Sequence, residues 1–278
     1  MQKIKEEEKK MIVMDLDGTL LNNDKTVSEQ SRIYLNNLKE EGYITVIATG
    51  RILKSAIIAT NGAEFANYIV CEAGAATYKN TEKTGEWKEI YEKLISKEIV
   101  NDILSQFDEK KFRNISVCSK DSINMYSKKY DSSKKITGKY NSKEELLKDT
   151  LKTTHISAYF FNNEFTKEYV NIFTQKYPEL SIRLMQDSFD DKQWIEISQK
   201  GVEKYNGIYK IAQIENIKNE NIIAFGDGLN DVEMLEKCGV GVAMKNALAE
   251  VKEKADYITE KSNFENGIIE FLKNYYKN

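Results

Sequence analysis

The feature that most constrains the fold is a continuous apolar run that ends at two aspartates. Residues 11–14 read MIVM, and Asp15 and Asp17 follow at once. A continuous rather than alternating apolar run predicts a strand buried on both faces, as in a parallel sheet. Like charges repel one another, and burying them is costly unless a cation compensates. The sequence therefore predicts a buried strand with a charged site at its carboxyl end.

The same pattern occurs in two more segments of the N-terminal part. Residues 43–51 (YITVIATGR) and 68–75 (YIVCEAGA) are apolar runs that end in polar residues or glycine. Between the first two runs, Ser28 can cap a helix and Gly42 can end it. We therefore expect a β-α-β unit in this part of the chain.

The pattern returns in the C-terminal part. Residues 221–228 (NIIAFGDG) predict a strand, residues 229–239 a helix, and residues 240–244 and 255–259 two short strands. Together with the N-terminal segments, they predict an α/β fold with a doubly wound, mostly parallel, Rossmann-like core sheet.

The segments in the middle of the chain are longer and more polar than those of the N-terminal and C-terminal parts. Residues 113–127 and 153–163 alternate between apolar and polar, as in antiparallel strands. We expect an inserted α+β domain over residues 84–193. The core would then be discontinuous, formed by residues 1–83 and 194–278.

The composition excludes several classes of partner. The 278 residues carry a net charge of -3 and contain no dense basic block, which predicts no nucleic-acid partner. No apolar run approaches the roughly 18 residues of a membrane span, and the first residues lack the apolar stretch of a signal peptide. The three cysteines are scattered without a C-x-x-C pair, as in a reducing compartment. We expect a cytoplasmic protein with no membrane partner, present as a monomer or a weak homodimer.

The chain contains one histidine, His155, in a segment that alternates like a strand. One histidine rules out a histidine-rich metal site and argues against a Ser-His-Asp triad. Acid–base chemistry would therefore come from carboxylates or lysine.

Polar residues follow several of the predicted core strands. Asp15 and Asp17, Thr49, and Asp227 with Asp231 fall at strand ends or just past them. In an open parallel sheet, ligands bind outside the carboxyl ends of the strands. A cluster of four aspartates is stable only around a cation, and oxygen ligands alone select a hard ion such as Mg²⁺.

Four motifs resemble those of the haloacid dehalogenase-type phosphatases. They are DLDGT, ATGR, a lysine after GV, and GDGLND. The sequence is most similar to the Cof-type members, which carry a large cap domain between the second and third motifs. The resemblance implies that the predicted insert is such a cap, a lid that excludes water and recognises the leaving group.

The resemblance implies a role for each matching residue. Asp15 would be the nucleophile that forms an aspartyl-phosphate, and Asp17 the general acid and then the general base. Thr49 would hydrogen-bond the phosphoryl group, and Lys204 would steady Asp15 and the phosphate. Lys200 is the rival lysine, although the GV-x-K context favours Lys204.

Two sets of ligands follow from the same resemblance. Mg²⁺ would be held by the carboxylates of Asp15, Asp227 and Asp231 and the carbonyl of Asp17. The substrate phosphate would be bound by Thr49, Gly50, Lys204 and Asn230.

Some positions depart from the family pattern or lack a role. Ala73 stands where an asparagine is usual, and Lys245 where a glycine is common. We expect Arg51 to form a structural ion pair and Glu196 to brace the insert. Within the insert, the residues proposed to contact the leaving group are Arg113, Arg183 and His155.

These observations predict a Mg²⁺-dependent phosphatase of small phosphorylated metabolites. Sugar phosphates are the first substrate class, followed by pyridoxal phosphate and flavin mononucleotide. Two alternatives remain open. One is a phosphomutase of the same fold, and the other is a non-catalytic sensor of a phosphorylated metabolite.

Overall fold

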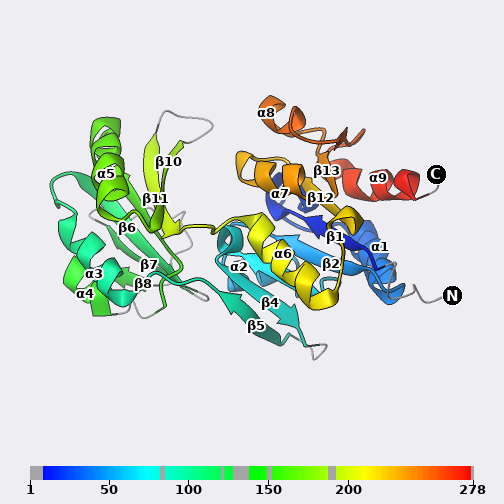
Figure 1. Cartoon of the computed structure of the whole chain (residues 1–278), viewed down its shortest axis with the longest axis horizontal. Coiled ribbons are helices and arrows are strands. Elements are labelled where there is room, and N and C mark those ends of the chain that lie inside the picture. The colour runs from blue at the N-terminus through cyan, green and yellow to red at the C-terminus, as the bar shows by residue number, and fades with distance from the viewer. Residues whose placement is uncertain are drawn as a thin grey trace. The chain divides into compact units, whose positions relative to one another are not determined.

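The computed structural model describes residues 9–81, 85–119, 122–127, 138–148, 152–186 and 192–276. The chain forms two compact units (Figure 1). The core unit contains Met1–Tyr91 and Glu203–Asn278, and the insert unit contains Glu92–Val202.

The core unit is built on a sheet of eight strands in the order β14-β13-β12-β1-β2-β3-β4-β5. Neighbouring strands are parallel from β14 to β3, and β4 is antiparallel to β3. The strands are β1 (Met11–Met14), β2 (Ile44–Ala48), β3 (Tyr68–Cys71), β4 (Ala76–Asn80), β5 (Trp87–Glu92), β12 (Ile222–Gly226), β13 (Val240–Ala243) and β14 (Tyr257–Ile258). The predicted doubly wound, mostly parallel sheet is confirmed.

The apolar run at residues 11–14 forms the central strand. All four side chains of β1 are fully buried. β12 and β2 flank β1 on its two edges, with Met14 paired to both Phe225 and Ile47. A strand in this position contacts helices on both faces, which explains why its sequence does not alternate.

Helices cover both faces of the core sheet. They are α1 (Glu29–Glu40), α2 (Leu53–Ala59), α6 (Lys204–Glu215), α7 (Val232–Lys237), α8 (Ala249–Lys252) and α9 (Gly267–Tyr275). The predicted cap of α1 is confirmed, because the side chain of Ser28 accepts a hydrogen bond from the backbone N–H of Ser31. The connection from β1 to β2 runs across the sheet in the opposite direction from that between β12 and β13. Right-handed crossovers in opposite directions place α1 and α7 on opposite faces.

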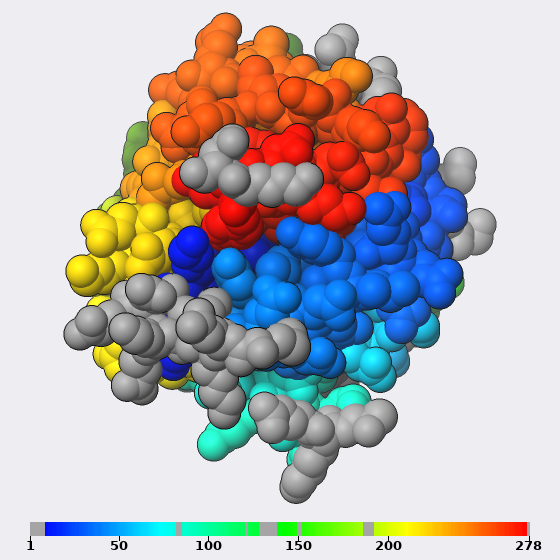
Figure 2. Space-filling model, turned by 90° about the vertical axis from the view of Figure 1, so that its right-hand side faces the viewer, coloured from blue at the N-terminus to red at the C-terminus, as the bar shows by residue number. Residues whose placement is uncertain are grey.

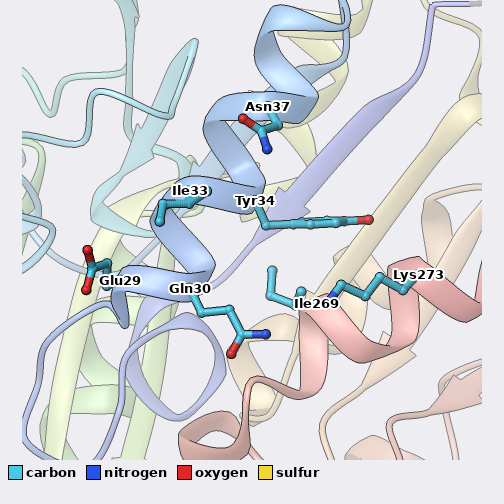
Figure 3. A pocket seen from close by; sticks show the side chains of 7 residues that line it. All are labelled: Glu29, Gln30, Ile33, Tyr34, Asn37, Ile269 and Lys273. Atoms are coloured by element: carbon cyan, nitrogen blue, oxygen red, sulfur yellow. The ribbon is translucent and has the colours of Figure 1, made fainter.

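The C-terminal helix α9 lies beside α1. Figure 2 shows the red C-terminal segment against the blue N-terminal segment on one face of the molecule. A pocket of about 410 Å³ lies between the two helices (Figure 3). Its lining contains none of the predicted site residues and consists of Glu29, Gln30, Ile33, Tyr34, Asn37, Ile269 and Lys273.

The insert unit is built on a second sheet, with the strand order β10-β11-β9-β6-β7-β8. The strands are β6 (Phe112–Ser119), β7 (Ser122–Ser127), β8 (Gly138–Tyr140), β9 (His155–Phe160), β10 (Leu180–Gln186) and β11 (Gln193–Gln199). Apart from the parallel pair β7 and β8, the pairs are antiparallel. The helices are α3 (Lys97–Gln106), α4 (Lys143–Lys148) and α5 (Asn163–Lys176).

The bounds of the insert differ from the predicted 84 and 193. β5 (Trp87–Glu92) is the edge strand of the core sheet, so the chain leaves the core later than expected. β11 (Gln193–Gln199), which we assigned to the core, pairs with β9 and β10 in the insert. The reason is visible in its sequence, because the buried Ile195 and Ile197 alternate with more polar residues as in a sheet covered on one face.

None of the helices that the structure describes combines the length and apolarity that crossing a bilayer requires.

Candidate active site

Three core strands end at one edge of the sheet with a polar residue. Asp15 follows β1, Thr49 follows β2, and Asp227 follows β12. Because these strands are parallel and adjacent, their carboxyl ends meet at this edge. The predicted convergence of segments that are distant in sequence is therefore present.

Lys204 lies at the centre of this group. Its Nζ donates hydrogen bonds to Oδ1 of Asp15 and Oδ1 of Asp231, each at 2.6 Å. Lys204 is only 2% exposed, and it is the first residue of α6. The rival Lys200 is exposed and belongs to the insert unit. The structure thus places Lys204, and not Lys200, beside Asp15.

Asp231 connects the lysine to the turn after β12. While its Oδ1 accepts from Lys204, its Oδ2 accepts from the backbone N–H groups of Asp227 and Gly228, both at 3.0 Å. The side chain is almost completely buried. Asp231 therefore fixes the turn that carries Asp227, in addition to balancing the charge of Lys204.

Gly18 and Thr19 position the loop after β1 against Asp227. The hydroxyl of Thr19 donates to Oδ1 of Asp227 at 2.8 Å. Gly18 has a φ of +80°, and a Cβ on it would lie 2.2 Å from Oδ2 of Asp227. Only glycine fits this conformation and this contact. The DGT sequence thus has a geometric reason at each position after Asp17.

Two asparagines, which the sequence analysis did not single out, bind the backbone of the same loop. Asn246 Nδ2 donates to the carbonyl of Gly18 at 2.7 Å. Asn263 Nδ2 donates to the carbonyl of Leu21 at 2.8 Å, and its backbone N–H donates to Oδ1 of Asn246 at 3.0 Å. The feature of the sequence that could have identified Asn246 is its position shortly after β13, a core strand. We call Asn246 and Asn263 the asparagine pair.

The electrostatics of the cluster show an excess of negative charge. Burial raises the pKa of Asp15 to about 7, and Lys204 offsets only part of this rise. Burial likewise raises the pKa of Asp227 to about 6. Burial alone would lower the pKa of Lys204, but Asp15 and Asp231 outweigh it and the pKa is raised. One lysine therefore does not neutralise three neighbouring carboxylates.

The donor set suits a hard divalent cation. One oxygen each of Asp15, Asp227 and Asp231 lie within 4.8 Å of one another. Thr19 donates to Oδ1 of Asp227, so Oδ2 is the oxygen that Asp227 would offer to a cation. Oxygen ligands with excess negative charge match the preference of Mg²⁺.

The side chain of Asp17 is held apart from this cluster. Arg51 binds its carboxylate through two nitrogens, and Lys25 Nζ donates to Oδ1 at 2.9 Å. Burial would raise the pKa of Asp17, but Arg51 and Lys25 outweigh it and lower the pKa to about 2. The expected ion pair of Arg51 is confirmed, although the sequence did not indicate that its partner would be Asp17.

The remaining predicted phosphate ligands differ in burial. Thr49 is 1% exposed, and its Oγ1 accepts from the backbone N–H of Arg51 at 3.2 Å. Gly50 and Asn230 are exposed. Thr49 and Gly50 come directly after β2, the strand next to β1, which carries Asp15 at its end. Asn230 lies in a short 3-10 helix, Leu229–Asp231, directly before Asp231.

The turn after β3 has a strained backbone. Glu72 and Ala73 have φ values of 52° and 54°, in the left-handed region that residues other than glycine and asparagine seldom adopt. The N–H of Ala73 donates to the carbonyl of Thr49 at 3.0 Å. A Cβ on Gly74 would lie 2.1 Å from the carbonyl oxygen of Glu203, the residue before Lys204. The turn thus packs between the Thr49 loop and the start of α6, and strain of this kind often occurs at functional sites.

The residues singled out in the insert all lie on its sheet. Arg183 in β10 and Glu196 in β11 are cross-strand neighbours with an Nη2–Oε2 distance of 3.7 Å. His155 is half-buried in β9, and Arg113 is exposed in β6. In the core, Lys245 is exposed just after β13.

Comparisons with known proteins identify the family. The model of the haloacid dehalogenase-like hydrolase family matches residues 12–272. The chain is 27% identical over 279 residues to the 5-amino-6-(5-phospho-D-ribitylamino)uracil phosphatase YitU of Bacillus subtilis (strain 168), covering 96% of this chain and 97% of that protein. It is 26% identical over 266 residues to the Escherichia coli (strain K12) protein YbjI, which has the same named activity, covering 95% and 94%. The crystal structure of TM0651 from Thermotoga maritima has a TM-score of 0.76 at 25% identity, covering 96% of this chain and 97% of that one.

The match over almost the whole chain places the protein in the haloacid dehalogenase-like hydrolases. Within that family it is a phosphatase that acts on small phosphorylated molecules, and the predicted resemblance to the Cof-type members is confirmed.

Proposed function

We propose that the protein is a Mg²⁺-dependent phosphatase that works through an aspartyl-phosphate on Asp15. The observation that carries the proposal is the position of Lys204 between Asp15 and Asp231, with Asp227 beside them. A buried lysine keeps one carboxylate oxygen of Asp15 oriented, and the other oxygen remains to attack phosphorus.

The reaction would proceed in two displacements. An oxygen of Asp15 forms a bond to phosphorus while the bond from phosphorus to the leaving oxygen breaks, and Asp17 gives its proton to that oxygen. A water molecule then gives a proton to Asp17 and attacks phosphorus, and the bond between phosphorus and the Asp15 oxygen breaks. Inorganic phosphate is released, and Asp15 returns to its starting state.

The acidic cluster would hold the Mg²⁺ ion. Its ligands would be the carboxylates of Asp15, Asp227 and Asp231 and the carbonyl of Asp17. When bound, the ion would supply positive charge that offsets the acidity of the cluster and of the phosphate. Thr49, Gly50, Lys204 and Asn230 would bind the phosphoryl oxygens.

Asp17 must leave its ion pair to serve as an acid. With a pKa of about 2 it is ionised at neutral pH, and an ionised carboxylate has no proton to donate. We therefore propose that Asp17 separates from Arg51 and Lys25 before the leaving group departs.

Phosphorylated polyols and sugars are the proposed substrates. The relatives YitU and YbjI are named for a substrate in which a ribityl chain carries the phosphate. This substrate is close in chemistry to the sugar phosphates that we expected from the sequence. It is the first compound to test, followed by flavin mononucleotide and simple sugar phosphates.

Phosphate release by purified protein tests the proposal. We expect turnover of p-nitrophenyl phosphate with Mg²⁺, loss of turnover after chelation by EDTA, and loss in Asp15→Asn. Binding of phosphorylated metabolites without release would indicate the sensor instead. Interconversion of phosphate isomers with little release would indicate the phosphomutase. Turnover that persists in Asp15→Asn would contradict the proposed nucleophile.

A further inference from the structure

The loops at the catalytic edge of the core sheet form two zones of opposite charge. Around Lys204, three carboxylates lie close together with one lysine. Around Asp17 the balance is reversed, because Arg51 and Lys25 both bind its single carboxylate. We call Arg51 and Lys25 the cation pair. The proposed reaction places the metal and the phosphate in the acidic zone, and it gives the surplus positive charge of the other zone no role.

Both members of the cation pair depend on Asp17. Nε of Arg51 lies 2.7 Å from Oδ2 of Asp17, and Nη2 of Arg51 and Nζ of Lys25 lie 2.8 Å and 2.9 Å from Oδ1. Among the residues that the structure describes, Asp17 is the one carboxylate within ion-pairing distance of either cation. When Asp17 turns towards the leaving oxygen, as the proposed reaction requires, two neighbouring positive charges therefore lose the anion that they share.

A tight turn fixes the backbone of Lys25. Its N–H donates to the carbonyl of Asn22 at 2.9 Å, and the N–H of Asn22 donates to the carbonyl of Thr26 at 2.8 Å. Asp24 accepts through Oδ1 from the N–H and the hydroxyl of Thr26. Lys25 has a φ of 64°, in the left-handed region that a lysine seldom adopts. Such a conformation persists only where the surrounding structure holds it, and here it accompanies the placement of Nζ beside Asp17.

A small anion can reach the cation pair from solvent. The side chain of Lys25 is 61% exposed, that of Asp17 43% and that of Arg51 23%. All three residues belong to the core unit, so the cation pair is complete within that unit.

The chemistry of the cation pair suits a carboxylate. A guanidinium binds a carboxylate through two parallel N–H groups, and an ammonium adds a compact point charge. The pair already holds the carboxylate of Asp17 in this geometry. A carboxylate of another molecule can therefore take the same place once Asp17 has left it.

We propose that the cation pair binds a carboxylate on the leaving group of the substrate, a few bonds from the leaving oxygen, and that this carboxylate displaces Asp17. The inference rests on the proposed function, because Asp17 is there the general acid. It adds small phosphorylated hydroxy acids to the polyol and sugar phosphates. The short spacing follows from the reach of Asp17, since one aspartate side chain must serve both the cation pair and the leaving oxygen.

The exchange would couple binding of the substrate to release of the acid. A ligand shifts a conformational equilibrium towards the state that it binds better. A carboxylate on the leaving group binds the cation pair only after Asp17 has separated from it, so it favours the state in which Asp17 faces the leaving oxygen. An uncharged leaving group gives no such assistance.

Kinetics with three esters of similar size test the proposal. Phosphoglycolate, hydroxyethyl phosphate and phosphoethanolamine carry a carboxylate, a hydroxyl and an ammonium at the corresponding position of the leaving group. We expect kcat/KM of the wild type to fall in that order. Lys25→Met should lower the ratio of kcat/KM for phosphoglycolate to that for hydroxyethyl phosphate by about fivefold, as for the loss of one partly exposed ion pair. Lys25→Arg keeps the charge and should retain most of the ratio.

A matched control separates contact from the general field of the protein. Lys54 is exposed in the first turn of α2 (Leu53–Ala59), shortly after Arg51 in the sequence. Lys54→Met removes the same charge as Lys25→Met and should leave the ratio unchanged. A ratio that is the same in Lys25→Met as in the wild type, or that falls equally in Lys54→Met, would overturn the proposal.

Acetate binding tests the cation pair independently of catalysis. Asp17→Ala removes the carboxylate between the two cations, and acetate has the size of the missing group. In EDTA, we expect acetate to raise the Tm of Asp17→Ala saturably and more than chloride does at equal ionic strength. Asp17→Ala/Lys25→Met should bind acetate at least about fivefold more weakly.

The wild type, in which Asp17 already fills the place, should respond to acetate no more than to chloride. If the wild type hydrolyses none of the three esters, the proposed function fails, and the acetate titration still tests the cation pair. Equal responses of Asp17→Ala to acetate and chloride, or equal acetate binding with and without Lys25, would contradict the inference.

Discussion

Arg51 holds Asp17 through two hydrogen bonds, with Nε 2.7 Å from Oδ2 and Nη2 2.8 Å from Oδ1. This paired geometry matches the planar guanidinium to the planar carboxylate. It keeps the proposed general acid ionised and away from the cluster around Lys204. The first change along the proposed reaction is therefore the loss of this contact.

A double-mutant cycle should detect the coupling between Arg51 and Asp17. We expect Arg51→Ala and Asp17→Asn to show a coupling of about 0.5–1 kcal/mol in the free energy of unfolding at pH 7, because the pair is partly exposed. Arg51→Lys should lose part of it, since lysine lacks the planar fork. The depressed pKa means that this stabilisation is present above pH 3.8 and is lost as the pH falls through about 2. Additive effects in urea unfolding would show that the two residues do not interact in solution.

Lys204→Met should have a large effect on both stability and activity. It leaves the buried carboxylates of Asp15 and Asp231 without their cation, at a cost of about 3–5 kcal/mol in the free energy of unfolding. Phosphate release should fall by at least about a thousandfold, in line with the loss of a buried group that orients a nucleophile. Lys200→Met is the matched control, because Lys200 is exposed. Equal effects of the two substitutions would contradict the assignment of Lys204.

The raised pKa of Asp15 predicts a pH-dependent stability. Its stabilising contribution is fully present below the ordinary value of 3.8 and is lost as the pH rises through about 7. In metal-free protein, Asp15→Asn should therefore gain stability relative to the wild type as the pH rises from 4 to 8. Added Mg²⁺ should reduce the difference, because it stabilises the ionised wild-type cluster. Thermal unfolding in EDTA and in Mg²⁺ measures both effects, and a difference that is constant with pH would refute the expectation.

The asparagine pair predicts an effect on metal binding without a direct contact to the metal. Asn246→Ala removes the donor to the carbonyl of Gly18, whose neighbour Asp17 is the proposed carbonyl ligand. We expect the Mg²⁺ concentration for half-maximal activity to rise by roughly tenfold, as for other residues that orient ligands. Ser28→Ala is the control, since it removes the cap of α1 and a 2.6 Å hydrogen bond to Asn266, neither of which involves Gly18 or Asp17. The same shift in both variants would indicate a general loss of stability rather than positioning.

Sequence patterns predicted the parts of the fold that depend on burial. The apolar run at residues 11–14 predicted a strand buried on both faces. The carboxylates that follow several strands predicted that the carboxyl ends of these strands meet at one edge of the sheet. The patterns did not predict contacts between side chains. Nothing in the ATGR sequence indicates that Arg51 binds Asp17, because the pairing depends on how two loops meet after folding. The insert boundary was wrong for a related reason, since an alternating strand such as β11 fits either sheet until its pairing partners are known.

Backbone strain in the turn after β3 can be tested with two substitutions, at Ala73 and Ala75, that should change the free energy of unfolding in opposite directions. Its φ of 54° lies in the left-handed region, whereas Ala75, two residues on, has a φ of -71° and a helical ψ. Ala73→Gly should raise the free energy of unfolding by about 1 kcal/mol, because glycine adopts a positive φ without a Cβ clash. Ala75→Gly should lower it by about 0.5–1 kcal/mol or more, since it only adds freedom to the unfolded chain and removes a buried methyl group. Ala73→Asn introduces the residue that the family resemblance led us to expect, and it should also stabilise the turn, because asparagine tolerates this conformation better than alanine. Urea unfolding of the three variants measures these changes, and a loss of stability in Ala73→Gly would show that the turn has relaxed to another conformation in solution.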